Sequence, residues 1–497
     1  MEGFRIAVTT AFSLSVFAAA MAGVAWGIIG GALPGISASI TMALLLPFTY
    51  GMDPTVALTL LASTYVGAEY GGSIPAILIR TPGTGAAAAT VLDGYSMHVQ
   101  GRGDEALGLS LVAGVIGGVF GMIILVSLTK VLAGFALLFT PPSYFALAVL
   151  GLSIVAAVSE GSLIKGLMAA CLGLAIATVG SDPMTAIPRF TFDRVELYSG
   201  VKPILILIGV FAVSEMFIQA SEPQWAPTSS KMRIKLPSLA MWRRIWPSVG
   251  IGSVAGSLEG VTPGAGGSVA SFIAYNEAKR WSRHREEFGK GSPEGIAAPE
   301  AANNAVAATA LIPTLSFGVP GSNSTAVLLG GLLIHGIEPG PMLFTRHPDL
   351  VYGLFGGLFV ANFSQLLLGI IMLGPCLWLV NRPKPYLMGF ILALVFTGIY
   401  TLDGSVFDLA LVLAGGVFGY ILRKLGFPIL PLVLGLVLGS MVEQNYRRAL
   451  QLSGGDLSTF IGDPVSIVLL GLSALIIVTS IGAPLFRRHW RSIPETT

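Results

Sequence analysis

Two interrupted apolar segments hold the residues best suited to bind a ligand. Residues 74–84, IPAILIRTPGT, align without gaps with residues 312–322, IPTLSFGVPGS, and a Pro-Gly pair occupies the same place in each copy. Proline lacks a backbone donor and glycine allows unusual dihedrals, so each pair should end a helix inside an apolar stretch. The helix that starts after each break exposes unpaired N–H groups carrying about half a positive charge. Two such breaks facing each other could hold a carboxylate.

Glycines and small polar side chains near the breaks would supply the remaining contacts to that anion. Small residues in membrane helices also help helices pack, and a Pro-Gly pair can simply kink a helix. The repetition of the pattern in both halves favours a binding site. We therefore predict this substrate-binding set: Ser37, Ser39, Thr41, Gly83, Thr84, Gly85, Asn303, Asn304, Gly321, Ser322, Asn323, Ser324 and Thr325.

Three charged residues lie beside the breaks. Ionisable groups inside a membrane are costly, and they mark functional positions by default. Glu69 and Glu300 could carry a proton, ligate a cation or cap a helix end. Arg80 lies within the first break, where it could pair with a substrate carboxylate or extend to the membrane interface. We predict a coupling or charge-pairing role for these three residues.

A second repeated pattern suggests where a coupling ion could bind. Pro34-Gly35 and Pro263-Gly264 follow apolar segments at matching places in the two halves. Unwound carbonyl groups at such positions would suit Na⁺, so the expected coupling ion is Na⁺ or H⁺. The sequence has no phosphate-binding loop, no H-E-x-x-H pattern and no clustered Cys/His spacing. We therefore expect no metal centre, no cofactor and no use of ATP by this chain.

Composition indicates an all-α polytopic membrane protein. Hydrophobic residues make up 54% of the 497 residues, charged residues only 11%, and the mean hydropathy is +0.79. The net charge of +2 shows no nucleic-acid footprint. We predict about 10–12 transmembrane helices in two inverted repeats with broken or re-entrant helices. The predicted parts are a first repeat (1–219), a polar and cytoplasmic loop rich in Lys and Arg (220–247), a second repeat (248–442), and a C-terminal loop, span and tail (443–497).

Four long segments resemble one transporter family. They are GGALPGISASITMALLLPFTYG (30–51), EYGGSIPAILIRTPGTGAAA (69–88), GVTPGAGGSVASFIAYNEAKR (260–280) and FGKGSPEGIAAPEAANNAVAATALIPTLSFGVPGSNSTAVLLGG (288–331). With them, roughly residues 18–440 resemble the large membrane subunit of the tripartite tricarboxylate transporters, the TctA family.

The resemblance implies a permease of the bacterial inner membrane rather than an enzyme. It implies two partners, a small TctB-like membrane subunit and a periplasmic, TctC-like solute-binding protein. It also implies uptake of carboxylates such as citrate, driven by an ion gradient. Two alternatives from other classes are a passive anion channel and an intramembrane enzyme. The enzyme would need a nucleophile–base pair or metal cluster, which the sequence does not show.

Overall fold

A computed structural model describes residues 2–136, 139–158, 162–182, 184–221, 232–264, 266–340, 342–382 and 384–491. Contacts divide the chain into two compact units, each described by itself. Unit 1 comprises Met1–Gly134 and Ile204–Tyr420, and unit 2 comprises Phe135–Pro203 and Ile421–Thr497. Each predicted repeat contributes residues to both units, so the unit boundaries differ from the repeat boundaries, which remain a prediction. Part of the predicted 220–247 loop, residues 222–231, lies outside the described residues.

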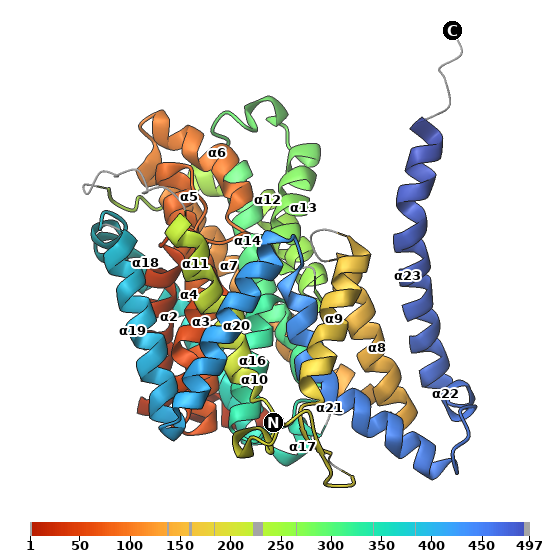
Figure 1. Ribbon diagram of the computed structural model, residues 1–497. Helices are drawn as coiled ribbons and strands as arrows, with labels where there is room; N and C mark the ends of the chain where they lie inside the picture. Colours follow the sequence, from red (N-terminus) through yellow and green to blue (C-terminus); the bar gives the residue numbers. More distant parts are fainter. Residues whose placement is uncertain are drawn as a thin grey trace. The chain divides into compact units, whose positions relative to one another are not determined.

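Unit 1 is built from helices, several of them short (Figure 1). They are α1 (Glu2–Ala11), α2 (Leu14–Gly31), α3 (Ala38–Leu45), η1 (Leu46–Thr49), α4 (Pro54–Gly71), α5 (Ser73–Ile79), α6 (Ala88–Val99), most of α7 (Gly103–Ala136), α10 (Pro203–Ile208), the π-helical η3 (Gly209–Val213), α11 (Ser214–Ser221), α12 (Leu239–Val261), α13 (Gly266–Trp281), η4 (Arg285–Glu287), α14 (Glu294–Thr309), α15 (Leu311–Phe317), α16 (Asn323–Ile334), α17 (Leu343–Arg346), α18 (Pro348–Val380), α19 (Lys384–Asp403) and most of α20 (Val406–Lys424). The predicted polar loop ends earlier than residue 247, because Ser238 accepts the Met241 N–H and starts α12 at Leu239.

The helices of the described residues are suited to a membrane. Eight are long and apolar enough to cross it: Leu14–Gly31, Gly103–Thr129, Pro141–Val158, Pro203–Ser221, Pro348–Val380, Pro385–Asp403, Val406–Lys424 and Ile429–Leu452. Shorter apolar helices cover Ala38–Thr49, Leu163–Ala177, Asn323–Ile334 and Pro464–Ser480. The predicted all-α polytopic class is confirmed.

Glycines bring α2 and α4 into close contact in the first half of the chain. A Cβ atom at Gly23 would lie 2.4 Å from the carbonyl oxygen of Leu60, and one at Gly27 would lie 2.3 Å from that of Thr64. Only glycine fits at such distances, so these positions let two helix backbones approach directly. Because both residue numbers rise together along the contact, α2 and α4 run parallel.

The same packing recurs between α12 and α14 in the second half. A Cβ atom at Gly252 would lie 2.1 Å from the carbonyl oxygen of Ala298, and one at Gly256 would lie 2.2 Å from that of Ala302. These glycines follow Gly23 and Gly27 by 229 residues, the spacing of the two Pro-Gly turns after α2 and α12. The sequence duplication therefore corresponds to a duplicated helix packing.

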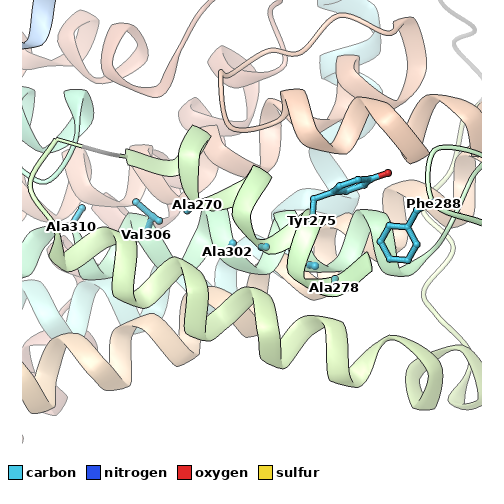
Figure 2. Close-up of a cluster of buried hydrophobic side chains, with 9 residues drawn as sticks. Ala270, Tyr275, Ala278, Phe288, Ala302, Val306 and Ala310 are labelled. Atoms are coloured by element: carbon cyan, nitrogen blue, oxygen red, sulfur yellow. The ribbon is translucent and has the colours of Figure 1, made fainter. Parts of the chain in front are cut away.

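A cluster of small side chains fills the space between α12, α13 and α14 (Figure 2). Two aromatic rings close one end of it, where Tyr275 and Phe288 meet edge to face with centroids 5.4 Å apart. Its buried members are Ala270, Ala274, Tyr275, Ala278, Phe288, Ala298, Ala302, Val306 and Ala310. Alanines at these positions let three helices pack closely and hold α14 in a fixed orientation.

Unit 2 is a helical unit with a small strand pair. Its elements are the last residues of α7 and α20 together with α8 (Pro141–Val158), α9 (Leu163–Ala177), β1 (Gly180–Ser181), β2 (Pro188–Arg189), η2 (Val195–Leu197), α21 (Ile429–Leu452), α22 (Thr459–Gly462) and α23 (Pro464–Arg491). The antiparallel strands pair Gly180 with Arg189. Helix α9 packs on α21 through Gly173 and Gly435, whose Cβ atoms would lie 1.9 and 2.2 Å from carbonyl oxygens of the opposite helix.

Four charged residues tie the strand pair of unit 2 to α21. Arg447 donates to both carboxylate oxygens of Asp182, at 3.0 and 2.8 Å. Arg189 forms a two-pronged contact with Glu443, at 2.6 and 3.1 Å. Main-chain N–H groups of Thr185 and Met184 also donate to Asp182, and together with Arg447 they hold the pKa of this carboxyl below its usual range.

We expect Asp182→Asn to lower the apparent Tm of the purified protein at about pH 7. A depressed folded-state pKa contributes stability above the pKa of the unfolded chain, and this contribution is lost as the pH falls through the folded-state pKa. The difference from the parent protein should therefore shrink below about pH 4. Thermal unfolding at both pH values checks this, with the exposed Glu196→Gln as control. Equal Tm values for D182N and the parent at neutral pH would contradict it.

Candidate substrate-binding site

Both repeated segments contain a helix break of the same shape. Helix α5 ends at Arg80, with φ of 58°, and α15 ends at Gly318, with φ of 73°. The two residues occupy equivalent places in the duplicated sequence, and both adopt the left-handed conformation. The chain then continues through the Pro-Gly pairs to α6 and α16. The interruptions are therefore where the repeated pattern predicted them.

The predicted glycines Gly83 and Gly321 are needed for close packing inside each half. A Cβ atom at Gly83 would lie 1.9 Å from the Gly31 carbonyl oxygen, and its N–H donates to Gly72 at 3.0 Å. A Cβ atom at Gly321 would lie 2.9 Å from the Gly260 carbonyl oxygen. The first break is thus packed against the end of α2, and the second break against the end of α12.

The two breaks meet at the start of α13. The Tyr65 hydroxyl of α4 and the Ser322 hydroxyl of the second break lie 3.2 Å apart. A Cβ atom at Gly85, in the first break, would lie 2.7 Å from Ser268 Oγ in α13. Ser322 also lies close to Gly266, at the beginning of the same helix. Residues of both halves therefore converge here.

Asn303 joins this meeting point from α14. Its Nδ2 donates to the Glu69 carbonyl oxygen at 3.5 Å, and a Cβ atom at Gly267 would lie 2.5 Å from its Oδ1. Three buried polar atoms have no hydrogen-bond partner among the described residues, namely Asn303 Oδ1, Glu69 Oε2 and Thr84 Oγ1. Buried polar atoms in folded proteins normally have partners, so these three leave hydrogen-bonding capacity for a ligand or ion at this point.

Glu300 links the two halves about one helical turn away. Its Oε1 accepts hydrogen bonds from Ser73 of α5, at 2.5 Å, and from Thr90 of α6. Its Oε2 has no partner among the described residues. Glu69 pairs with Asn303, and Ser73 pairs with Glu300. Along this contact the residue number rises from 69 to 73 in the first half and falls from 303 to 300 in the second. The segments that meet here therefore run in opposite directions.

Asn304 lies apart from Asn303. Its Nδ2 donates to the Glu300 carbonyl oxygen at 3.1 Å, and its Oδ1 accepts from Gln365 of α18 at 3.2 Å. Gly114 and Gly118 of α7 leave room for these amides, because Cβ atoms there would lie 2.7 Å from Asn304 and 2.0 Å from Asn362. The structure places Asn304 in a buried amide cluster between α7, α14 and α18.

The three hydroxyl side chains predicted in the first half make hydrogen bonds within their own segment. The hydroxyls of Ser37 and Ser39 lie 2.9 Å apart, and Thr41 donates to the Ser37 carbonyl oxygen at 3.0 Å. Ser37 also starts α3 by accepting the N–H of Ile40. Among the described residues, no hydrogen bond joins these three side chains to Asn303 or to the second break, although α3 packs against α16.

The first predicted Na⁺ position lies beside a buried acid. Gly35 has φ of +82°, and a Cβ atom there would lie 1.9 Å from Gln219 Nε2 and 3.4 Å from Glu215 Oε1. Both side chains come from α11, directly after a π-helical turn of the kind often found at functional sites. The equivalent Gly264 instead donates its N–H to Gly321, at 3.2 Å. The two predicted Na⁺ positions therefore differ in their surroundings.

The tip of the second break is partly capped by its own side chains. Ser322 Oγ accepts the Thr325 N–H at 3.2 Å, and Thr325 Oγ1 accepts the Ser322 N–H at 2.9 Å. The expectation of a wholly free helix start at α16 is wrong, because this reciprocal pair satisfies two N–H groups. Ser324 is buried, whereas Asn323 is exposed.

Arg80 lies on the surface, away from the meeting point. Its side chain is exposed, and its guanidinium lies 5.8 Å from the centroid of the Tyr95 ring. This position agrees with an arginine that extends to the interface. Among the described residues, the buried charged side chains of the helices include Glu69, Glu215 and Glu300 but no Lys or Arg. A substrate anion bound here would therefore need hydrogen-bond donors and a compensating cation.

Several residues at the site were not predicted from the sequence. Tyr65, Ser268 and Gln365 contact predicted residues only across long chain separations, so no local pattern marks them. Asp93 is another: its Oδ1 accepts three main-chain N–H groups from the loop before α14, and its Oδ2 accepts the Tyr275 hydroxyl. In the sequence, only its acidic type sets Asp93 apart, and nothing there shows that it binds residues 289–292.

Comparison with known proteins agrees with the earlier resemblance. A family model for the tripartite tricarboxylate transporter TctA family matches residues 17–434. An Agrobacterium vitis protein named "Uncharacterized 52.8 kDa protein in TAR-I ttuC' 3'region" is 38% identical over 461 residues, 92% of this chain and 91% of that protein. A second one, "Uncharacterized protein in TAR-II ttuC' 3'region", is 37% identical over 228 residues, 46% of this chain and 93% of its own length. No solved structure matches the chain.

The family match covers most of the chain, including both breaks and the residues that join them. The helices of the structure also agree with a multi-pass membrane protein. The chain therefore belongs to the tripartite tricarboxylate transporter TctA family, and it is a transporter subunit.

Proposed function

We propose that the chain is the large permease subunit of a secondary, ion-gradient-driven uptake system for tricarboxylates or dicarboxylates such as citrate. In this proposal it lies in the bacterial inner membrane with a TctB-like small subunit, and a TctC-like periplasmic protein delivers the substrate. The observation that carries the proposal is the convergence of both breaks, where Tyr65 contacts Ser322 and Asn303 contacts Glu69.

The substrate carboxylates would bind between the breaks. Thr84, Asn303 and Ser322 place hydroxyl and amide groups there, and the exposed residues Gly85 and Asn323 lie at the tips of the two breaks. Helix starts and neutral donors can hold an anion without a buried Lys or Arg. Ser37, Ser39 and Thr41 would contribute only if their present hydrogen bonds rearrange during transport.

The coupling ion would balance the negative charge of the carboxyl groups of Glu69 and Glu300. Glu69 and Glu300 each have one carboxyl oxygen without a partner among the described residues, close to the proposed anion site. An anion beside two ionised carboxyls is unfavourable, so H⁺ or Na⁺ should enter together with the substrate. This requirement gives a physical reason for symport rather than passive flow.

Inverted repeats would allow alternating access. The opposite order of the Glu69–Asn303 and Ser73–Glu300 contacts supports an inverted relation between the halves. In transporters of this kind, one part moves against another around a fixed site at mid-membrane. The short contacts across the breaks would then have to open and re-form in each cycle.

Uptake in vesicles containing this chain and its two proposed partners tests the function. A panel of carboxylates should accumulate only when a Na⁺ or H⁺ gradient is imposed, and Asn303→Ala should lower uptake by at least about tenfold if it loses about 1.4 kcal/mol of binding. A matched control is Asn445→Ala, because this amide donates to Met441 of its own helix α21. Flux that persists after both gradients collapse would instead show a passive channel, and normal uptake by N303A would refute the site.

A further inference from the structure

A surface pocket lies beside α6, away from the meeting point of the two breaks. Its volume is about 540 Å³. Two cations line it, Arg80 at the end of α5 and Lys290 in the loop before α14, together with Tyr95, Leu92 and Val99 of α6. The proposed transport site contains none of these residues, so the pocket needs its own explanation.

Both cations are held on a fixed backbone. Arg80 caps α5 in the left-handed conformation, and its guanidinium lies over the Tyr95 ring. The Lys290 carbonyl accepts from Gln100 at 2.7 Å, and Asp93 binds the N–H groups on either side of it. Within the described part of the chain, neither cation has a carboxylate at ion-pair distance. Two unpaired positive charges therefore face one pocket.

The remaining wall of the pocket is apolar and exposed. Leu92 is 42% exposed and Val99 is 68% exposed, and both lie on the outer face of α6 with Tyr95. The inner face of the same helix carries Thr90 and Asp93, which contact the second half of the chain. A pocket with two cations and an apolar strip fits a ligand that has an anionic head and a hydrocarbon tail.

The charge pattern gives the side of the membrane. The end of α6 lies beside Gly103 and Met232, and the stretch 232–247 contains four Lys or Arg residues and no Asp or Glu. Its backbone is fixed to the start of α7 by hydrogen bonds from Arg233 and Lys235 to Asp104. An excess of Lys and Arg in short loops marks the cytoplasmic side, where the leaflet carries anionic lipids.

We infer that this pocket binds the phosphate headgroup of an anionic phospholipid from the cytoplasmic leaflet. Arg80 and Lys290 contact the phosphate, and the acyl chains run along Leu92 and Val99. Because Arg80 caps α5 two residues before the first Pro-Gly pair, the bound headgroup also fixes the end of α5. This inference rests on the pocket and on the charge of residues 232–247, and it does not depend on the transport cycle proposed above.

Native mass spectrometry of the purified protein with phosphatidylglycerol tests the inference, with phosphatidylcholine as the neutral lipid. The parent protein should retain phosphatidylglycerol, and each of Arg80→Gln and Lys290→Gln should weaken its binding about fivefold. Both side chains are exposed, so the variants should fold, which an unchanged Tm in phosphatidylcholine vesicles will show. The matched control is Arg283→Gln, an exposed cation outside the pocket.

Each outcome decides between explanations. Selective loss of phosphatidylglycerol in the two pocket variants, with normal retention by R283Q, supports the inference. Equal retention by all variants, or equal loss in R283Q, overturns it. Inorganic phosphate or citrate that displaces the lipid from the parent protein at comparable concentration would show that the pocket takes a free anion, which also overturns the lipid assignment.

Discussion

Glu300→Gln should strongly lower gradient-driven uptake while substrate exchange between the two sides of the membrane continues. The glutamine oxygen can still accept hydrogen bonds from the hydroxyls of Ser73 and Thr90, so these contacts between the two halves are kept. The amide cannot take up or release a proton, and it no longer attracts a cation. Coupling between sites in proteins typically amounts to about 5- to 150-fold, and uptake should fall within that range.

The measurement is paired uptake and counterflow in vesicles with the complete transport system. Glu286→Gln is the control, since this exposed glutamate lies in η4, outside the site. Glu300→Ala removes the acceptor and should in addition lower the apparent Tm. If E300Q accumulates substrate as the parent does, Glu300 is structural and the coupling role falls to Glu69 or to another group.

The breaks could be predicted because their causes are local. Proline and glycine act on the residues next to them, so the end of α5 at Arg80 and of α15 at Gly318 follows from the sequence itself. The duplication then made the pattern recognisable in both halves. Helix type and the approximate bounds of the long apolar helices are local in the same sense, since each depends on a run of apolar residues.

The direction of single side chains could not be predicted in the same way. Asn303 and Asn304 are adjacent and both amides, but successive residues of a helix point about 100° apart. One therefore reaches the breaks, and the other reaches Gln365 on α18. Which of the two does so depends on how α14 packs against α12 and α13, and that packing is a long-range property.

Contacts between the two halves could not be predicted from the sequence either. Tyr65 and Ser322 are 257 residues apart, and Asp93 binds a loop almost 200 residues further along the chain. The type of neither Tyr65 nor Asp93 indicates which distant partner it meets. The capped tip at Ser322 and Thr325 is the opposite case, because a reciprocal pair three residues apart is visible in the sequence.

Gly252→Ala should destabilise the protein, whereas Gly250→Ala should not. Both glycines lie in α12, two residues apart, but a Cβ atom at Gly252 would come within 2.1 Å of the Ala298 carbonyl oxygen, and one at Gly250 meets nothing within 4 Å. Replacing a helical glycine by alanine gains about 0.5–1 kcal/mol from the backbone, while overpacking costs about 1–3 kcal/mol. The two variants should therefore shift the apparent Tm in opposite directions.

The effect should grow when Gly252 and Gly256 are both replaced, because each faces the backbone of α14 rather than a side chain that can rotate. Helix α14 would have to move outward, and it carries Glu300 and Asn303 to the breaks. The double variant should thus lose Tm and uptake together, while Gly250→Ala keeps both. Thermal unfolding and uptake of the same preparations measure this. A double variant with parental Tm would mean that α12 and α14 are not in direct backbone contact, and the positions of Glu300 and Asn303 would then lose their structural support.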